Sequence, residues 1–375
     1  MNPFPAVDPI PLPAPVLLFK GLHILTLALH FITVELLFGG LLVATWLNLL
    51  GVMRRQDAAA ELRLTAAAAL AKRLTVVMTY LINLGVPPLL FAQVLYGRAL
   101  YTSSVLIGVY WIAVIFLLMA CYWLIYQFAA GAEKGKAVWW KGLLAWLLAG
   151  AIAKIYVTNM TLMIRPEVWG QMYATTAHGS QLPPHDPTAF PRWLFMMTGG
   201  FWVAGIWMVW LAGRRAFEDP VRRYLAANGG RLAVVMLIAQ AFVAARVLQA
   251  QPQGIRDALA ADPLAHYAGL AWIGVAVLIG IFGVWAAVKQ PIGRAAGWIG
   301  ATLLLLGMLG MTVYRDALRD QTLLSKGFDV WRRDPVTNWS VVILFLALFV
   351  AGLGVVGWLI SVMMKAKTIP EKVNP

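Results

Sequence analysis

The stretch LHFITVELLFGG, residues 29–40, lies in the middle of an apolar run that extends from residue 16 to residue 52. A helix needs about 20 mostly apolar residues to cross a hydrocarbon core of about 30 Å, so this run is long enough to span a membrane. It nevertheless contains His30 and Glu35. Ionisable groups are costly inside a bilayer and usually have a function there. The stretch therefore predicts a transmembrane helix whose polar residues take part in a site.

The composition extends this prediction to the whole chain. Of 375 residues, 61% are hydrophobic and 12% are charged, and the mean hydropathy is +0.76. These values are typical of a membrane protein and exclude soluble globular, disordered and nucleic-acid-binding chains. The single cysteine, Cys121, excludes a disulfide framework, a cysteine-rich metal cluster and covalently attached haem. Any haem would be held by side-chain coordination alone.

Nine runs of mostly apolar residues are long enough to cross a membrane. The sixth is the shortest, because Gln240 and Arg246 interrupt it, so eight spans are the alternative count. We expect an all-α integral membrane protein, a bundle of about nine transmembrane helices. The predicted spans cover residues 16–52, 74–95, 103–128, 138–164, 191–211, 232–248, 266–288, 295–313 and 338–364.

The distribution of basic residues orients these spans. Most of the 30 Lys and Arg residues fall in loops on one side of the predicted bundle, which is expected to be the cytoplasmic side. The net charge of +14 therefore reflects topology, with a periplasmic N-terminus and a cytoplasmic C-terminus. Because no Lys or Arg precedes Lys20, we expect the first span to be retained and not cleaved as a signal peptide. We expect a proline-rich external segment over 1–15, one transmembrane domain over 16–364 with a non-helical outer loop at 165–192, and a cytoplasmic tail over 365–375.

All five histidines fall on the predicted outer side of the membrane. His23 and His30 lie in the outer part of the first span, and His266 begins the seventh. His178 and His185 lie in the outer loop, where they are candidate ligands for a metal or for a partner's haem, or are simply exposed. Histidines gathered at the outer face would suit a cofactor that exchanges electrons with the periplasm.

His23 and His30 are seven residues apart, which is two helical turns. They project from nearly the same face, about 10 Å apart along the helix axis, so one haem cannot use both. Either each serves a different cofactor, or one is a haem ligand and the other forms a hydrogen bond near a haem propionate or a quinone. A polar contact between helices is the further alternative for each.

Glu35 is the one carboxyl group deep inside a predicted span, and Lys154 is a cation well inside the fourth span. Buried charges are kept mainly when they are paired, so a Glu35–Lys154 ion pair is the first interpretation. A proton-relay role for Glu35 is the second.

Two further features of the spans bear on a site. Consecutive prolines, Pro87 and Pro88, predict a kink in the second span and free carbonyl groups there. Arg246 and Arg315, at the outer ends of the sixth and eighth spans, are candidates for pairing with haem propionates. The alternative for both arginines is that they extend to the lipid headgroups.

The first span resembles the opening helix of subunit I of the cytochrome bd quinol oxidases. There, as in residues 29–40, a His-Phe pair is followed by a short apolar stretch, a glycine and a long aliphatic run. Weaker similarity extends over residues 72–97, 157–166 and 199–205. The resemblance implies a bd subunit I-like bundle of nine helices in the bacterial cytoplasmic membrane. It also implies that His30 matches a haem ligand near the outer face.

The chain departs from that family at several functional positions. Met196 stands where the family has a histidine ligand in its fifth helix, although methionine can also ligate haem iron. Residues 271–272 stand where the family has a methionine ligand, and Gln93 stands at one position of the family's acidic pair. Residues 314–319 replace the family's sequence signature before the last loop. Only residues 251–265 occupy the place of the long quinol-binding loop. We therefore do not expect oxygen reduction, and quinol oxidation in the manner of the family is in doubt.

The leading hypothesis is a membrane subunit of a respiratory electron-transfer complex that holds one or two b-type haems near the outer face. Electrons would pass between the quinone pool and a periplasmic c-type cytochrome or another subunit, and a quinone is a further candidate ligand. A homologous membrane subunit is a candidate partner besides membrane lipid. The second hypothesis is a haem-free anchor that docks periplasmic cytochromes. A transporter ranks third, because no inverted repeat is visible in the sequence.

Overall fold

The computed structural model describes the chain except for residues 1–3, 7–10, 290–291, 334 and 366–375. Within the described part, nine helices are long and apolar enough to cross a membrane, which confirms the predicted all-α membrane fold. These helices are α1 (Val16–Met53), α2 (Ala60–Leu106), α3 (Gly108–Glu133), α4 (Trp139–Leu162), α6 (Ala189–Ala212), α7 (Asp219–Gln249), α9 (Pro263–Val288), α10 (Arg294–Ser325) and α11 (Trp339–Lys365).

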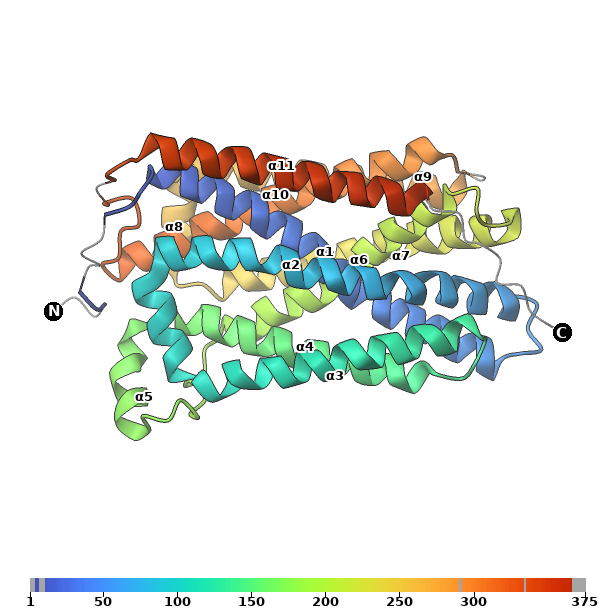
Figure 1. Ribbon diagram of the computed structural model, residues 1–375, viewed down its shortest axis with the longest axis horizontal. Coiled ribbons are helices and arrows are strands. Elements are labelled where there is room, and N and C mark those ends of the chain that lie inside the picture. The colour runs from blue at the N-terminus through green and yellow to red at the C-terminus, as the bar shows by residue number, and fades with distance from the viewer. Residues whose placement is uncertain (1–3, 7–10, 290–291, 334, 366–375) are drawn as a thin grey trace.

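The long helices run side by side along the long axis of the molecule (Figure 1). The end at which α1 and α11 begin is called the N-terminal end here. Three short helices lie between long ones and close to that end: η1 (Pro166–Val168), α5 (Trp169–Thr175) and α8 (Gln253–Ala261). The outer loop at 165–192 was expected to be non-helical, and this is corrected by η1 and α5, where a proline at the first position favours a helical start.

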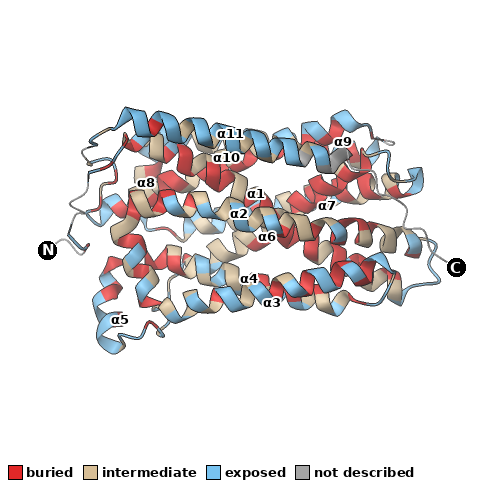
Figure 2. Cartoon of the chain, viewed as in Figure 1, coloured by how far each residue is buried: buried red, intermediate tan, exposed pale blue. Residues whose placement is uncertain are grey.

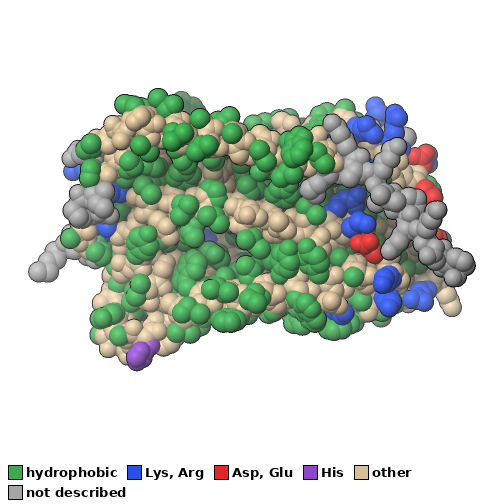
Figure 3. All heavy atoms as spheres, in the orientation of Figure 1, with side chains coloured by type: hydrophobic (Ala, Val, Ile, Leu, Met, Phe, Trp, Pro, Cys, Tyr) green, Lys and Arg blue, Asp and Glu red, His purple; other side chains and the backbone are tan. Residues whose placement is uncertain are grey.

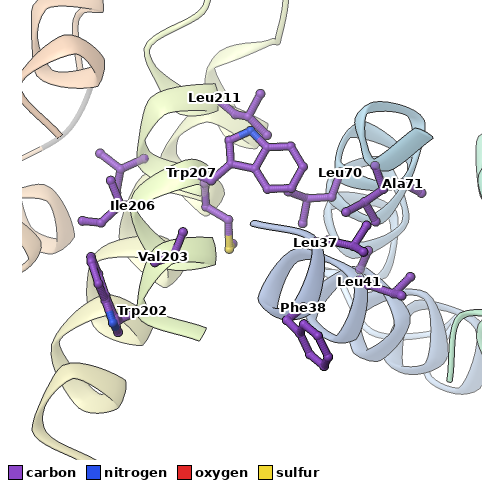
Figure 4. Packing of buried hydrophobic residues seen from close by; sticks show 14 of the residues in the cluster. Leu37, Phe38, Leu41, Leu70, Ala71, Trp202, Val203, Ile206, Trp207 and Leu211 are labelled. Atoms are coloured by element: carbon purple, nitrogen blue, oxygen red, sulfur yellow. The ribbon is translucent and has the colours of Figure 1, made fainter. Parts of the chain in front are cut away.

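Helix α1 forms the centre of the bundle and packs against α2, α4, α6 and α10. Its crossing with α6 brings two backbones into contact, because a Cβ added to Gly39 would lie only 1.7 Å from the carbonyl oxygen of Gly200. Two glycines at one crossing permit this approach, as at other helix contacts in membranes. Beside the crossing, Trp207 of α6 points toward Leu70 of α2 (Figure 4). The polar residues of α1 are therefore held inside the protein.

Helix α2 is much longer than the predicted span at 74–95 and continues beyond it at both ends. The expected kink at Pro87 and Pro88 is also corrected. The non-helical backbone lies at Tyr96, with φ −123° and ψ 19°, while both prolines remain inside the helix. Each proline has no amide hydrogen and therefore removes one backbone hydrogen bond from the helix.

Helix α11 lies on the outside of the bundle, and most of its side chains are exposed (Figure 2). At its start it is joined to the N-terminal segment by a parallel β-bridge between Leu12 and Pro335. The amide of Val336 donates to the carbonyl of Leu12 at 2.9 Å, and that of Asn338 donates to Pro13 at 3.3 Å.

The surface has the character of a membrane protein. Apolar side chains cover the length of the visible face, and Lys and Arg gather at the end opposite the N-terminal end (Figure 3). The division into an external segment, a transmembrane domain and a cytoplasmic tail stays a prediction. Residues 366–375 of that tail lie outside the described residues, as do residues 1–3 and 7–10 of the external segment.

Candidate functional site

His23 of α1 is held near the N-terminal end with one ring nitrogen bonded and the other free. The residue is only 2% exposed. Its Nδ1 lies 3.0 Å from the carbonyl oxygen of Pro88 in α2, and because a carbonyl only accepts, Nδ1 carries the proton. Nε2 is buried and has no hydrogen-bond partner among the described residues. A neutral imidazole with this tautomer fixed and Nε2 free is the form in which histidine binds a metal.

His30 lies two turns further along α1 and contacts the same neighbouring helix. Its ring packs against Gly85 of α2, where an added Cβ would lie 2.9 Å from Cε1 of His30. Its Nδ1 is buried, again without a partner in the described part of the chain. Both histidines therefore project toward α2, as their seven-residue spacing predicts.

A buried group of charged and polar side chains, here called the ionic cluster, joins α1, α2 and α10 beside His23. Lys20 Nζ donates to Asp316 Oδ2 at 2.6 Å, to Asp320 Oδ2 at 2.5 Å and to the Tyr96 hydroxyl at 2.6 Å. Arg319 pairs with Asp316, and its guanidinium carbon lies 4.0 Å from the centre of the Tyr96 ring. That ring is 6.2 Å from the ring of His23, centre to centre. The ionic cluster consists of Lys20, Tyr96, Asp316, Arg319 and Asp320.

Sequence reasoning missed the ionic cluster, although the sequence carries a signal for it. Lys20 lies one turn inside an apolar run, where a cation needs a counter-charge. Asp316 and Asp320 are four residues apart and therefore share one face of a helix. Spacing alone could not pair them with Lys20, because the partners are about 300 residues apart along the chain.

Arg315 lies next to the ionic cluster, whereas Arg246 lies outside it. Nη1 of Arg315 is buried without a partner among the residues described, and its guanidinium carbon lies 5.5 Å from the centre of the Phe31 ring. Arg192 and Arg319 are both close enough to act on its charge. Arg246 is exposed on α7, and its side chain bonds to Gln249 one turn away, at 3.1 Å. Of the two arginines predicted to pair with haem propionates, the structure therefore places Arg315 beside the ionic cluster and Arg246 away from it.

The predicted ion pair between Glu35 and Lys154 does not form. Glu35 lies at the middle of α1 and is 1% exposed, while Lys154 is exposed on α4. No salt bridge joins them among the described residues, and Oε2 of Glu35 is buried without a partner. Every face of α4 is largely apolar, so the sequence did not reveal which face points outward.

The other predicted ligands are dispersed, as is His266, the remaining histidine. His178 and His185 are exposed in the segment between α4 and α6, and His266 is exposed at the start of α9. Met196 is half-buried and packs against the apolar core. Within the described ranges, no group of three or more His, Cys, Asp or Glu residues is placed to hold a metal ion. The site that the structure assembles is therefore His23 with the ionic cluster and Arg315.

Comparison of the sequence with protein-family models and with curated proteins gives no match. Comparison with solved structures finds the bd oxidase from Geobacillus thermodenitrificans, with a TM-score of 0.64 over 95% of this chain and 99% of that chain. The chain has the fold of a bd oxidase subunit. Sequence identity to that bd oxidase chain is only 12%. The fold predicted from the first span is thus confirmed, and this chain is a divergent example of it.

Proposed function

We propose that the chain is a membrane subunit of a respiratory electron-transfer complex, with a b-type haem bound near the N-terminal end. Electrons would pass between a quinone and a periplasmic cytochrome, with the chain in the bacterial cytoplasmic membrane. The bd oxidase fold supports the class of protein. The observation that carries the proposal is His23, whose Nε2 is buried and unbonded while Nδ1 is fixed by Pro88.

The residues around His23 fit the chemistry of a haem. His23 supplies a free imidazole nitrogen for the iron. Arg315 and Arg319 act on His23 electrostatically, and Nη1 of Arg315 and Nε of Arg319 are buried without partners in the described structure. Carboxylates such as the propionates are bound most strongly by such guanidinium donors. His30 and Met196 remain candidates for a second ligand or a second haem.

Each part of the protein has a defined task in this proposal. The Pro88 carbonyl keeps the imidazole of His23 in one tautomer and one orientation. The ionic cluster holds α1, α2 and α10 together around it. The haem itself supplies one-electron oxidation and reduction. Outer-surface residues such as His178 and His185 would face a partner cytochrome.

The test is a reduced-minus-oxidised absorbance spectrum with a haem-to-protein ratio for the purified full chain. We expect a b-type spectrum in the wild type and loss of haem in His23→Ala, because the ligand nitrogen is removed. His266→Ala is the matched control, since that histidine is exposed at the same end. Retention of full haem content by His23→Ala would show that His23 is not the ligand, and His30→Ala would then be measured.

A haem-free anchor that docks cytochromes is the second candidate. It is favoured by His30, the ligand implied by the family resemblance, because its ring is already packed against the backbone of Gly85. The same spectrum separates the two candidates. Intact, folded protein without any haem band would support the anchor.

A further inference from the structure

We propose that Glu35 is a proton-binding site in the middle of the bundle, protonated at rest and able to exchange its proton with the solvent. This inference goes beyond the electron-transfer role and does not depend on it. It concerns the middle of α1, whereas the haem proposal concerns His23 nearer the start of the same helix. The ligand is a single proton.

Three helices build the site. Glu35 comes from α1 and Gln240 from α7, and they meet at Gly199 of α6. A Cβ added to Gly199 would lie 2.8 Å and 2.9 Å from the two carboxyl oxygens of Glu35 and 2.9 Å from Nε2 of Gln240. The absence of a side chain at Gly199 is thus what leaves room for both polar groups. Glu35 is 1% exposed and Gln240 is 8% exposed.

Two acceptor oxygens at this site lack a donor. Oε2 of Glu35 and Oε1 of Gln240 are both buried without a hydrogen-bond partner among the described residues. The Nε2 amide of Gln240 instead donates to the carbonyl of Phe195 at 3.3 Å. A buried acceptor without a donor is unfavourable. A proton on Glu35 supplies the missing donor, whereas an ionised Glu35 would only add charge.

No cation pairs with Glu35 in the described structure: none of its salt bridges includes this carboxyl group, which is buried. On its own helix, His30 projects toward α2. Among the cations on the packed helices, Lys154 and Arg231 are exposed. Four others contact different groups: Arg192 bonds to Gln251, Arg315 lies over Phe31, Lys72 pairs with Glu133 and Arg73 bonds to Ala69. An isolated carboxylate in such surroundings takes up a proton instead of remaining charged.

The site is too poor in oxygen for a divalent cation. It offers one carboxyl group and one amide, whereas Ca²⁺ takes about 6–8 oxygen ligands and Mg²⁺ requires near-ideal octahedral geometry. A carboxyl group in a transmembrane helix that faces the protein interior is instead typical of proton relays. The chemistry therefore favours reversible protonation of the carboxyl group.

The experiment is infrared spectroscopy of the purified full chain at pH 7, where exposed glutamates are ionised. We expect a protonated-carboxyl C=O band that shifts in D₂O, shifts again when glutamate is labelled with ¹³C, and is lost in Glu35→Gln. Glu133→Gln is the matched control, because Glu133 is exposed and paired with Lys72, and it should leave the band unchanged. The ¹³C-labelled wild type needs no variant, so the result stands even if Glu35→Gln fails to fold.

Besides retention of the band by folded Glu35→Gln, three outcomes would overturn the proposal. One is a wild-type spectrum without a ¹³C-sensitive protonated-carboxyl band. A second is a band that does not shift in D₂O, because the proton would then not exchange. The third is loss of the band on adding Na⁺ at constant pH, which would make this a monovalent-cation site. None of these readouts depends on haem, so failure here and failure of the haem proposal are distinguishable.

Discussion

Lys20 is a buried lysine that forms ion pairs with two carboxylates of another helix, the buried Asp316 and the half-buried Asp320. Replacing Lys20 by Met keeps the length of the side chain and removes the charge. Breaking a buried pair from one side leaves uncompensated charge and costs about 3–5 kcal/mol, so we expect a clear fall in the thermal unfolding temperature of the detergent-purified protein.

Lys72→Met is the control for that change. Lys72 is paired with Glu133 at 3.3 Å, but both side chains are exposed, and such pairs contribute about 0–1 kcal/mol. An equal unfolding temperature for the Lys20 and Lys72 variants would mean that the ionic cluster does not stabilise the fold.

For single residues, the sequence predicts which polar side chains lie inside the membrane spans better than it predicts the groups that they contact. His23, His30, Glu35 and Arg315 stand out because they are polar residues in apolar runs. Their partners are a carbonyl of Pro88, a glycine and side chains of distant helices. These contacts depend on how each helix is rotated about its axis, and nearly uniform apolar sequence does not encode that rotation clearly.

Among the elements, the crossing of α1 and α6 is the most sensitive to added volume. We expect Gly39→Ala to prevent normal packing of the two helices, because the new Cβ would overlap the backbone of Gly200. The measurement is the yield of monodisperse protein after extraction and size-exclusion chromatography. Gly352→Ala in α11 is the control, since a Cβ there meets nothing within 4 Å. Equal yields for the two variants would contradict this account of the crossing.

The spans themselves were predictable, because length and hydropathy suffice to identify a membrane helix. The ends of α2 were not, since its polar turns continue the helix beyond the apolar run at 74–95. The position of its irregular backbone was not predictable either. The hydroxyl group of Tyr96 bonds to Lys20 and Asp320, and these tertiary contacts are not encoded in the local sequence.

For the whole molecule, the predicted orientation can be tested with single added cysteines. The native Cys121 is buried, so it should not react with a membrane-impermeant maleimide. Ser180 and Arg55 are exposed at opposite ends of the bundle. With a periplasmic N-terminal end, Ser180→Cys should be labelled in intact spheroplasts, and Arg55→Cys only after the membrane is opened. The reverse pattern would invert the topology.

The β-bridge between Leu12 and Pro335 joins residues that are synthesised at different times. Residue 12 leaves the ribosome more than 300 residues before its partner, Pro335. At about 5–20 residues per second, synthesis of the intervening chain takes tens of seconds. Throughout that time Leu12 lacks its partner in the bridge. Closure of this bridge therefore has to follow synthesis of residue 335, and it fastens the start of α11.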